Sequence, residues 1–309
     1  MTGPRPGEDA TAAHTEGTLA SGQYWQAWAA PSPGGVVVLV HGLHEHGGRY
    51  GHVAERLARA GYATYVVDHP GHGRSPGTRG DIASMAGAVD GVDRMVRLAG
   101  ERHPGVPLFV YGHSMGGLIA LTYLTGSPEP RVRGAVVSAP ALDTSAAAGL
   151  RGRLLPLVSR LLPDLGVLTL DAEAISRDPA VVRAYRSDPL NHTGQVRART
   201  GAEMTRAATV LPDRLPSLRM PLLVLHGGAD RLVPPAASEV VPARATSAEV
   251  TRQVYDGLFH EPHNEPEQER VLDDVVAWLD GHRGQGTPKE GRRDAGACGS
   301  GSRLPTSSV

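Results

Sequence analysis

The sequence Gly112-His-Ser-Met-Gly116 places a serine between two glycines, a spacing that suits a nucleophile. An apolar run typical of a buried strand, 107–111, precedes it, and an apolar helix, 116–124, follows it. A serine on such a tight turn has a strained backbone and an exposed hydroxyl. Glycines are needed beside it because a Cβ would clash with the strand and the helix. A helix N-cap serine would not explain both glycines, so we predict that Ser114 is a nucleophile.

A serine hydroxyl needs a general base, and the base needs a carboxylate that orients it. In proteins with this kind of serine turn, the acid and then the histidine follow the serine along the chain. Asp230 follows the apolar run 221–225, and His260 follows the run 250–254. Both positions are at the carboxyl ends of strands, where α/β sheets place their functional residues. We predict that Asp230 is the acid and His260 the base.

Four other titratable residues compete for these roles or lie beside them in the sequence. Asp256 is the alternative acid, and His263 is the alternative base. His113 is next to the serine, but we expect its side chain to point away from the serine side chain, which indicates a structural role. We interpret His226 as a core or turn histidine.

Acyl transfer also needs two backbone N–H groups where negative charge develops on the substrate oxygen. One donor is the residue after the nucleophile, Met115. The other comes from the loop after the apolar run 36–40, where Gly42 allows the turn and the Leu43 N–H can donate. We therefore predict an oxyanion hole formed by the N–H groups of Leu43 and Met115.

Histidine-rich and glycine-rich segments suggest a metal site or a nucleotide loop as alternatives. Residues 41–46 hold three histidines and a glutamate, but the chain lacks H-E-x-x-H, and a proline interrupts the pair His260 and His263. Residues 68–75 do not form G-x-G-x-x-G, and the only lysine is Lys289. We expect neither a metal nor a cofactor, and we interpret residues 68–75 as a turn that braces the site.

Short apolar runs alternate with helical periodicity along the middle of the chain. Continuous apolar runs are typical of strands that are buried on both faces. Strands that alternate with helices predict an α/β fold with a doubly wound, mostly parallel sheet. We predict strands at 36–40, 63–67, 107–111, 134–138, 221–225 and 250–254, and helices at 52–59, 86–101, 116–124 and 271–279.

Three segments depart from this pattern. Residues 141–212 interleave leucine with arginine and proline and contain no strand run, which predicts a helical insertion that covers the site as a cap. Residues 1–22 and 282–309 are polar, and such stretches bury too little apolar surface to offset the entropy cost of ordering. We predict a disordered leader at 1–22, one domain at 23–281, and a disordered tail at 282–309 that includes Cys298.

The overall composition disfavours several classes of protein. The 309 residues carry a formal net charge of -1, which argues against a nucleic-acid-binding protein. A single cysteine rules out an internal disulfide framework and a Cys-based zinc site. The first residues lack the features of a signal peptide, and no apolar run approaches the length of a membrane span. We expect a soluble, cytoplasmic protein.

Several separate blocks make the chain similar to a known family. Residues 41–50 fit H-G-x-x-E-H-x-x-R-Y, which is much more specific than G-x-S-x-G. On these blocks, over about residues 20–281, the chain resembles the α/β-hydrolase superfamily and, within it, the monoacylglycerol lipase and lysophospholipase group (serine aminopeptidase S33-like). The other matching blocks are 68–75, Gly112–Gly117, Ser187–Leu190, Gly228–Arg231, and His260-Glu261 with Asn264-Glu265.

The resemblance implies the same roles for Ser114, Asp230, His260 and the two oxyanion donors. It adds Tyr185, which resembles a tyrosine that contacts a glycerol head group. Family members often have a small residue at the position of Leu43, so we expect its larger side chain to narrow the acyl channel.

The implied activity is hydrolysis of a carboxylic ester, with a monoacylglycerol cleaved to glycerol and fatty acid through an acyl-enzyme. We expect the cap to bind the acyl chain and to touch lipid surfaces transiently, since it mixes leucine with Arg151, Arg153 and Arg160. Alternative activities are those of a lysophospholipase, a short-chain carboxylesterase, a thioesterase or an acyltransferase. A non-catalytic ligand receptor is an alternative from another class, disfavoured because all three triad positions are filled.

Overall fold

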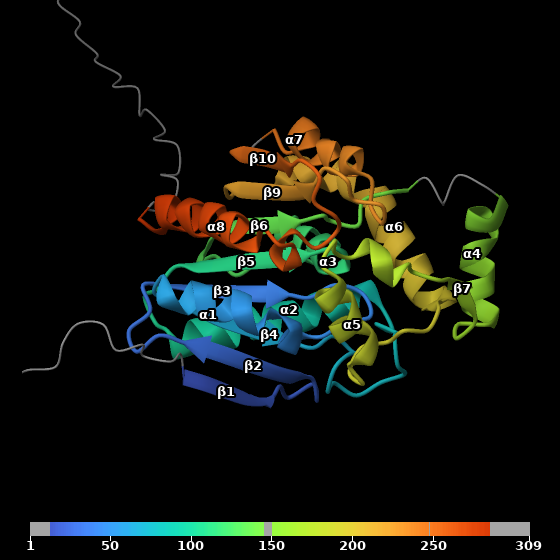
Figure 1. Cartoon of the computed structure of the whole chain (residues 1–309), viewed down its shortest axis with the longest axis horizontal. Coiled ribbons are helices and arrows are strands. Elements are labelled where there is room, and N and C mark those ends of the chain that lie inside the picture. Colours follow the sequence, from blue (N-terminus) through green and yellow to red (C-terminus); the bar gives the residue numbers. More distant parts are fainter. Residues whose placement is uncertain (1–12, 145–149, 247, 285–309) are drawn as a thin grey trace, which may run out of the picture.

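The computed structural model describes residues 13–144, 150–246 and 248–284. An eight-stranded sheet runs through the molecule in the order β1-β2-β4-β3-β5-β6-β9-β10 (Figure 1). β1 and β2 run antiparallel to their neighbours, and the remaining strands of this sheet run parallel. Its strands are β1 (Ala13–Thr18), β2 (Tyr24–Ala29), β3 (Gly35–Val40), β4 (Tyr62–Val67), β5 (Leu108–His113), β6 (Val132–Ser138), β9 (Leu222–Gly227) and β10 (Val250–Tyr255).

Helices cover both faces of the sheet (Figure 1). On one face lie α1 (Gly51–Arg59) and α8 (Gln268–Arg283). On the other face lie α2 (Met85–Arg102), α3 (Met115–Leu124) and α7 (Val240–Arg244). Short 3-10 helices connect these elements: η1 (Gly47–Tyr50), η3 (Ala172–Ala174), η4 (Leu215–Ser217), η5 (Pro235–Glu239) and η6 (Pro262–Asn264).

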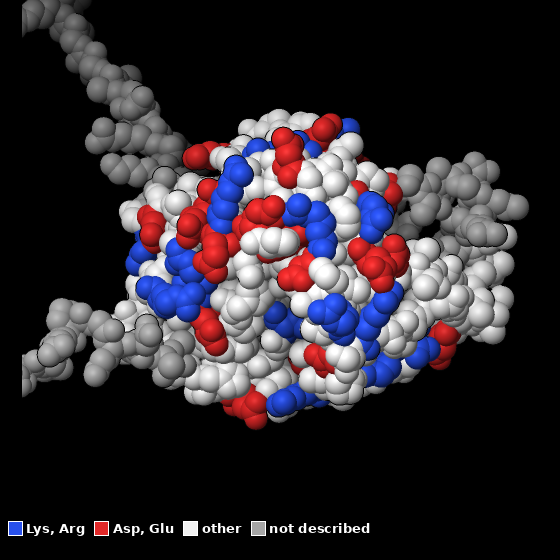
Figure 2. All heavy atoms as spheres, in the orientation of Figure 1, with Lys and Arg blue, Asp and Glu red and all other residues white. Residues whose placement is uncertain are grey.

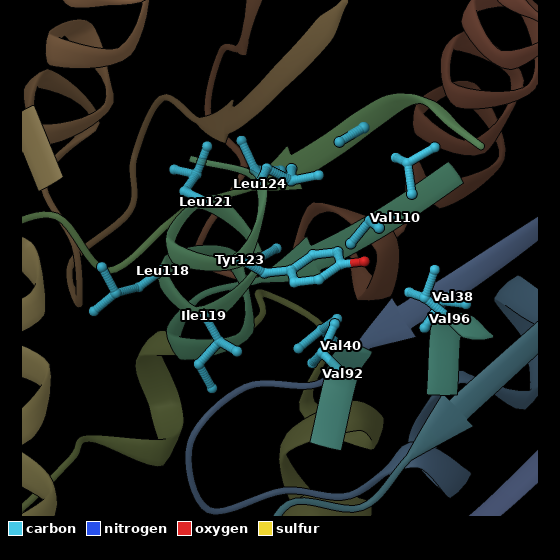
Figure 3. Close-up of a cluster of buried hydrophobic side chains, with 14 of the residues drawn as sticks. Val38, Val40, Val92, Val96, Val110, Leu118, Ile119, Leu121, Tyr123 and Leu124 are labelled. Carbon is cyan, nitrogen blue, oxygen red and sulfur yellow. The ribbon is translucent and has the colours of Figure 1, made fainter. Parts of the chain in front are cut away.

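Each face of the sheet has its own hydrophobic core. Figure 3 shows the core between the sheet and helices α2 and α3, where valines of β3 and β5 meet apolar side chains of both helices. Val36, Val38 and Val40 point into this core, whereas Val37 and Leu39 point into the core under α1 and α8. A strand covered on both faces needs apolar side chains on both, which explains its continuous apolar run.

The predicted strands and helices are present, and the predicted α/β fold class is confirmed. The sheet places the carboxyl ends of β3, β5, β9 and β10 at the same edge, because these strands run parallel. The segments after these four strands hold the predicted triad and oxyanion residues, whereas Tyr185 lies in the insertion.

The predicted disordered leader at 1–22 is wrong for its second half. Residues 13–18 form β1, which pairs with β2 from Ala13 opposite Ala29 to Thr18 opposite Tyr24. Neither strand was predicted from the sequence. An edge strand is held by backbone hydrogen bonds and needs few apolar side chains, so its polar composition resembles that of a disordered segment. Residues 1–12 lie outside the described residues.

The predicted tail at 282–309 begins too early, because α8 continues to Arg283. His282 is buried and stacks on Trp278, with 4.2 Å between the ring centroids. Residues 285–309, including Cys298, lie outside the described residues.

Between β6 and β9 the chain leaves the sheet and forms a mostly helical insertion, where the cap was predicted. It contains α4 (Leu150–Leu161), α5 (Pro179–Ser187) and α6 (Ala198–Arg214). A small antiparallel pair that was not expected, β7 (Gly166–Leu168) with β8 (Val196–Arg197), joins them. Figure 1 shows this insertion beside the carboxyl ends of the parallel strands. None of the helices in the described ranges has the length and apolarity that crossing a membrane requires.

Candidate active site

Ser114 lies on the turn between β5 and α3 with φ 52° and ψ -118°. A positive φ is rare for a residue with a side chain and persists only where the surroundings impose it. Here the Ser114 N–H donates to the Ser138 carbonyl (2.9 Å), and its own carbonyl accepts from the Ala141 N–H (3.0 Å). Gly116 is required because a Cβ would lie 2.0 Å from the Val40 carbonyl oxygen. The neighbouring strands therefore fix this turn at the carboxyl edge of the sheet.

The structure brings Ser114, His260 and Asp230 together in one hydrogen-bonded chain. The His260 Nε2 lies 2.9 Å from the Ser114 Oγ, and the His260 Nδ1 lies 2.7 Å from the Asp230 Oδ2. A carboxylate only accepts hydrogen bonds, so the Nδ1 carries the proton and the Nε2 is free to accept the serine proton. This arrangement can activate the hydroxyl for attack on a carbonyl carbon.

Four donors hold the Asp230 carboxylate. Its Oδ1 accepts from the N–H groups of Leu232 (2.8 Å) and Val233 (3.0 Å). Its Oδ2 accepts from His260 and also from the His226 Nε2 at 3.2 Å. Burial alone would raise the pKa of Asp230, but the His260 charge and these hydrogen bonds hold it well below its usual range. Asp230 is therefore ionised at neutral pH, and its orientation is fixed.

His260 is buried, and burial alone would lower its pKa. The charge of Asp230 and the hydrogen bond to it outweigh this effect and raise the pKa of His260 above the usual histidine value. The paired carboxylate thus makes His260 a stronger base than an isolated imidazole at the same depth.

The competing residues lie outside this hydrogen-bonded chain. Asp256 is exposed at the turn after β10. His263 is fully buried, and its ring stacks on Tyr50 with 5.0 Å between the centroids. His113 is buried, with its ring centroid 4.9 Å from that of His260, so it packs against the base without bonding to it.

The two predicted oxyanion donors lie beside the serine. Leu43 lines the same cavity as Ser114 and His260, and Met115 is the first residue of α3, directly after Ser114. The Leu43 side chain is partly buried and lines this cavity.

A buried charge network joins the loop that carries Leu43 to the loop that carries His260. Arg49 forms a bidentate ion pair with Glu261 (2.8 and 2.7 Å) and also bonds to Glu45. Burial would raise the pKa of Glu261, but the Arg49 guanidinium lowers it to about 2. From the sequence, Arg49, Glu45 and Glu261 stand out only as parts of blocks shared with a family, and no role is predicted for them. Only contacts between distant segments show that they lie beside the site.

The cavity over Ser114 is lined by both apolar and polar side chains. The apolar ones include Leu168, Ile175 and Met204 from the insertion. The polar ones include Glu45, Glu261 and Tyr185, and the Arg49 guanidinium lies 5.0 Å from the centre of the Tyr185 ring. Tyr185 is thus near the site, as predicted. A second groove, of about 530 Å³, lies between α2, α3 and α6, and Ser114, Asp230 and His260 do not line it.

Several histidines lie near the site, and histidine is a common metal ligand. In the described ranges, no three or more His, Cys, Asp or Glu side chains converge so that they could hold a metal ion. His41, His69 and His72 instead pack ring against ring and bond to the backbone.

The mostly parallel sheet, the strained serine turn and the Ser–His–Asp geometry define the class of protein: the chain is an α/β-hydrolase. Comparison with protein families is consistent with this class, since the family described as "Serine aminopeptidase, S33" matches residues 31–267. The chain belongs to this family. The fold, the family and the enzymatic nature predicted from the sequence are confirmed.

Relatives and solved structures agree with this assignment. The chain is 42% identical to a monoacylglycerol lipase of Mycolicibacterium smegmatis, over 81% of this chain and 89% of the relative. It is 31% identical to the phospholipase YtpA of Bacillus subtilis, over 82% and 98%. The crystal structure of a monoacylglycerol lipase from Paleococcus ferrophilus superposes with a TM-score of 0.76 at 33% identity, covering 84% of this chain and 99% of that one.

Proposed function

We propose that this enzyme hydrolyses the ester bond of monoacylglycerols to give glycerol and a fatty acid. The observation that carries the proposal is the hydrogen-bonded chain Ser114–His260–Asp230 beside a cavity that Ser114 and His260 line together with both apolar and polar side chains. A monoacylglycerol has an apolar chain on one side of its ester and a polar head on the other, so it needs both kinds of side chain. The similarity to named monoacylglycerol lipases supports this substrate.

In the proposed mechanism, the His260 Nε2 takes the Ser114 proton while the Oγ bonds to the ester carbonyl carbon. The N–H groups of Leu43 and Met115 stabilise the resulting oxyanion. The intermediate then collapses, and glycerol leaves with the proton from His260. Water attacks the acyl-enzyme by the same steps, which releases the fatty acid and returns the proton to Ser114. Asp230 keeps His260 in the reactive tautomer throughout.

The polar lining residues Tyr185, Glu45 and Glu261 are proposed to bind the head group. Tyr185 is only 8% exposed, and its ring is fixed by Arg49, so it offers a rigid edge to a diol. The apolar lining residues, such as Leu168 and Met204, would contact the acyl chain. Burial of each methylene contributes about 0.8 kcal/mol, so these contacts can supply much of the binding free energy.

The insertion is proposed to touch lipid surfaces transiently. Leu157, Leu161, Leu162 and Leu168 are each more than half exposed, and Figure 2 shows that the α4 and β7 end is largely uncharged on the face drawn. Exposed apolar side chains gathered on one element often mark such a contact. Leu161→Glu should therefore slow hydrolysis of dispersed long-chain monoacylglycerol and leave hydrolysis of a dissolved short-chain ester unchanged. Equal effects on both substrates would contradict the proposed contact.

The test of the activity is glycerol release from a long-chain monoacylglycerol by the wild type and by Ser114→Ala. We expect release by the wild type and a loss of at least about 10³-fold in the variant, because the nucleophile is absent. Thermal unfolding checks that the variant is folded, and a fluorophosphonate probe should label only the wild type. Serine-dependent activity on lysophospholipid but not on monoacylglycerol would contradict the proposed substrate and favour a lysophospholipase.

A further inference from the structure

The ring of His41 forms two hydrogen bonds that fix its protonation. Its Nδ1 lies 2.8 Å from the Gly42 carbonyl oxygen, which can only accept, so this nitrogen carries the proton. Its Nε2 accepts from the backbone N–H of His69 at 2.9 Å, so this nitrogen has none. His41 is fully buried, and burial lowers its pKa well below the usual histidine value. The ring is therefore neutral, with its proton on Nδ1.

These bonds determine the direction of the peptide between Gly42 and Leu43. The C=O and N–H of a trans peptide point in opposite directions. Because the Gly42 carbonyl points to the His41 ring, the Leu43 N–H must point away from that ring. The Gly42 N–H is held separately by the Glu45 Oε1 at 2.6 Å. Within the described part of the chain, the Leu43 N–H has no hydrogen-bond acceptor, so it is available to a ligand.

The peptide is also next to the serine. A Cβ on Gly42 would lie 3.4 Å from the Ser114 Cβ, and Leu43 lines the cavity that holds the Ser114 hydroxyl. If the peptide turned over, a carbonyl oxygen would replace this N–H at the site and would repel an oxyanion. The direction of this one peptide therefore decides whether the hole has two donors or one.

Residues 68–75 bond to both ends of the loop that follows β3, residues 41–47. The His69 Nε2 lies 3.2 Å from the His41 carbonyl oxygen, and the Asp68 Oδ1 accepts from the Gly47 N–H at 2.8 Å. Asp68 and His69 directly follow β4, which is the neighbour of β3 in the sheet. This segment therefore has a role beyond the chain reversal, because the His69 N–H selects the tautomer of His41.

We propose that His41 is a positioning residue for ester hydrolysis: its Nδ1–H holds the Gly42 carbonyl so that the Leu43 N–H faces the oxyanion, and the His69 N–H enforces the tautomer that this requires. The inference rests on the proposed function, since it assumes acyl chemistry at Ser114. The proposal gives a functional role to the contact between the blocks 41–50 and 68–75.

The first test uses the wild-type protein labelled with ¹⁵N-histidine. Nitrogen chemical shifts distinguish the two neutral tautomers from the cation. We expect His41, assigned by its disappearance in His41→Asn, to be neutral with its proton on Nδ1 between pH 6 and 8. A proton on Nε2, or a cation, would overturn the inference. This measurement needs neither a substrate nor an active variant.

The second test compares His41→Leu and His41→Asn with a matched control. Leucine fills the space without a donor, whereas the asparagine amide can replace the Nδ1–H. We expect kcat of His41→Leu on p-nitrophenyl butyrate to fall about 100-fold with KM nearly unchanged, as for loss of one oxyanion donor. His41→Asn should retain most of the activity. The control is His103→Leu. His103 lies between α2 and β5, and its ring bonds to the Tyr65 hydroxyl (2.9 Å). This substitution should leave kcat unchanged.

If His41 had only a packing role, His41→Leu would be more active than His41→Asn, because leucine suits a buried site better than asparagine. Folded His41→Leu with wild-type kcat, or folded His41→Asn as impaired as His41→Leu, would overturn the inference. Binding of an alkyl trifluoromethyl ketone, which forms a tetrahedral oxyanion with the serine, should weaken in parallel with kcat/KM. If the wild type cleaves p-nitrophenyl butyrate but not monoacylglycerol, the proposed substrate fails and the inference about His41 remains.

Discussion

At the scale of single residues, the reactivity of the site depends on the partners of one buried imidazole. His260 bonds to a serine on one side and a carboxylate on the other, and the charge of that carboxylate offsets the cost of burying an imidazolium. The reaction needs neutral His260 to accept the serine proton. Activity must therefore fall as the pH decreases through the pKa of this residue.

The first prediction concerns this pH dependence. Because Asp230 raises the pKa of His260, the acid limb of kcat/KM should lie above the usual histidine value of about 6.5. In Asp230→Asn the attractive charge is lost, so burial dominates and the limb should move to lower pH. The rate itself should fall by about 10⁴-fold, as in other Ser–His–Asp triads. Stopped assays from pH 5 to 9 measure both effects, and an unchanged limb in the variant would contradict the assignment of Asp230.

A second prediction concerns His226, which was interpreted from the sequence as a core or turn histidine. Its Nε2 donates to the Asp230 Oδ2 and to the Val233 carbonyl, at 3.2 and 3.0 Å. A hydrogen bond to a charged group contributes about 1.5 kcal/mol or more, so His226→Leu should lower kcat about 10-fold. His226→Gln can place an amide N–H at the same point and should restore most of the rate. If folded His226→Leu has the wild-type kcat, the prediction is wrong and His226 has only a packing role.

At the scale of secondary structure elements, the site requires close contact between backbones. Helix α3 begins directly after Ser114, and Gly116 allows this helix to lie against the end of β3. Gly227 has the same function at the end of β9, because a Cβ there would lie 2.0 Å from the Phe259 carbonyl oxygen. These two glycines set the spacing of the strands and turns that carry the triad.

The third prediction compares two glycine-to-alanine substitutions. In Gly116→Ala the new Cβ would meet backbone atoms of Val40 and His41, which cannot move without shifting β3. We expect a loss of stability of about 3 kcal/mol or more, the upper end of the usual cost of overpacking. Gly281→Ala in α8 meets nothing within 4 Å and should stabilise the protein by about 0.5–1 kcal/mol through helix propensity. Chemical denaturation measures both changes, and equal effects would contradict the close-contact argument.

At the scale of the whole molecule, folding buries many histidines in their neutral form. Burial lowers the pKa of His44, His69 and His263 to about 3 and that of His72 to about 4. In the unfolded chain these groups would have a pKa of about 6.5. They lie in the segments after β3 and β4 and in η6, which are distant in the sequence, so their burial depends on the complete fold.

The fourth prediction is a steep loss of stability in acid. Below about pH 6.5 the unfolded chain binds protons that the folded protein does not, so the free energy of unfolding falls as the pH decreases toward 4. Each such histidine contributes up to about 1.4 kcal/mol per pH unit. His260 opposes this trend because its folded-state pKa is raised. We expect Tm to drop sharply between pH 7 and 5.

A variant with one fewer titrating group provides the control for this prediction. His44 has φ 65°, a conformation that asparagine also tolerates, so His44→Asn should fold and show a shallower decline. A Tm that stays constant from pH 7 to 5 in the wild type would contradict the predicted burial of neutral histidines.

The sequence by itself determined the local features of this protein. Continuous apolar runs marked strands such as β3 because both faces of the sheet are covered, and glycines around Ser114 marked a turn that only small residues permit. The order of serine, acid and histidine then limited the choice to a few candidates. These signals depend on neighbouring residues, so they can be interpreted without the fold. The same reasoning failed for β1, because an edge strand is stabilised by its partner and not by its own apolar residues.

Only the tertiary structure decided which distant side chains meet. It placed Asp230 and His260, not Asp256 and His263, in line with Ser114. It also joined His41 to His69, and Arg49 to Glu261, although 212 positions separate the latter pair. Such contacts follow from the strand order and from the turns at one edge of the sheet. No local pattern specifies them, since a buried polar group needs a partner but its own sequence does not say which one.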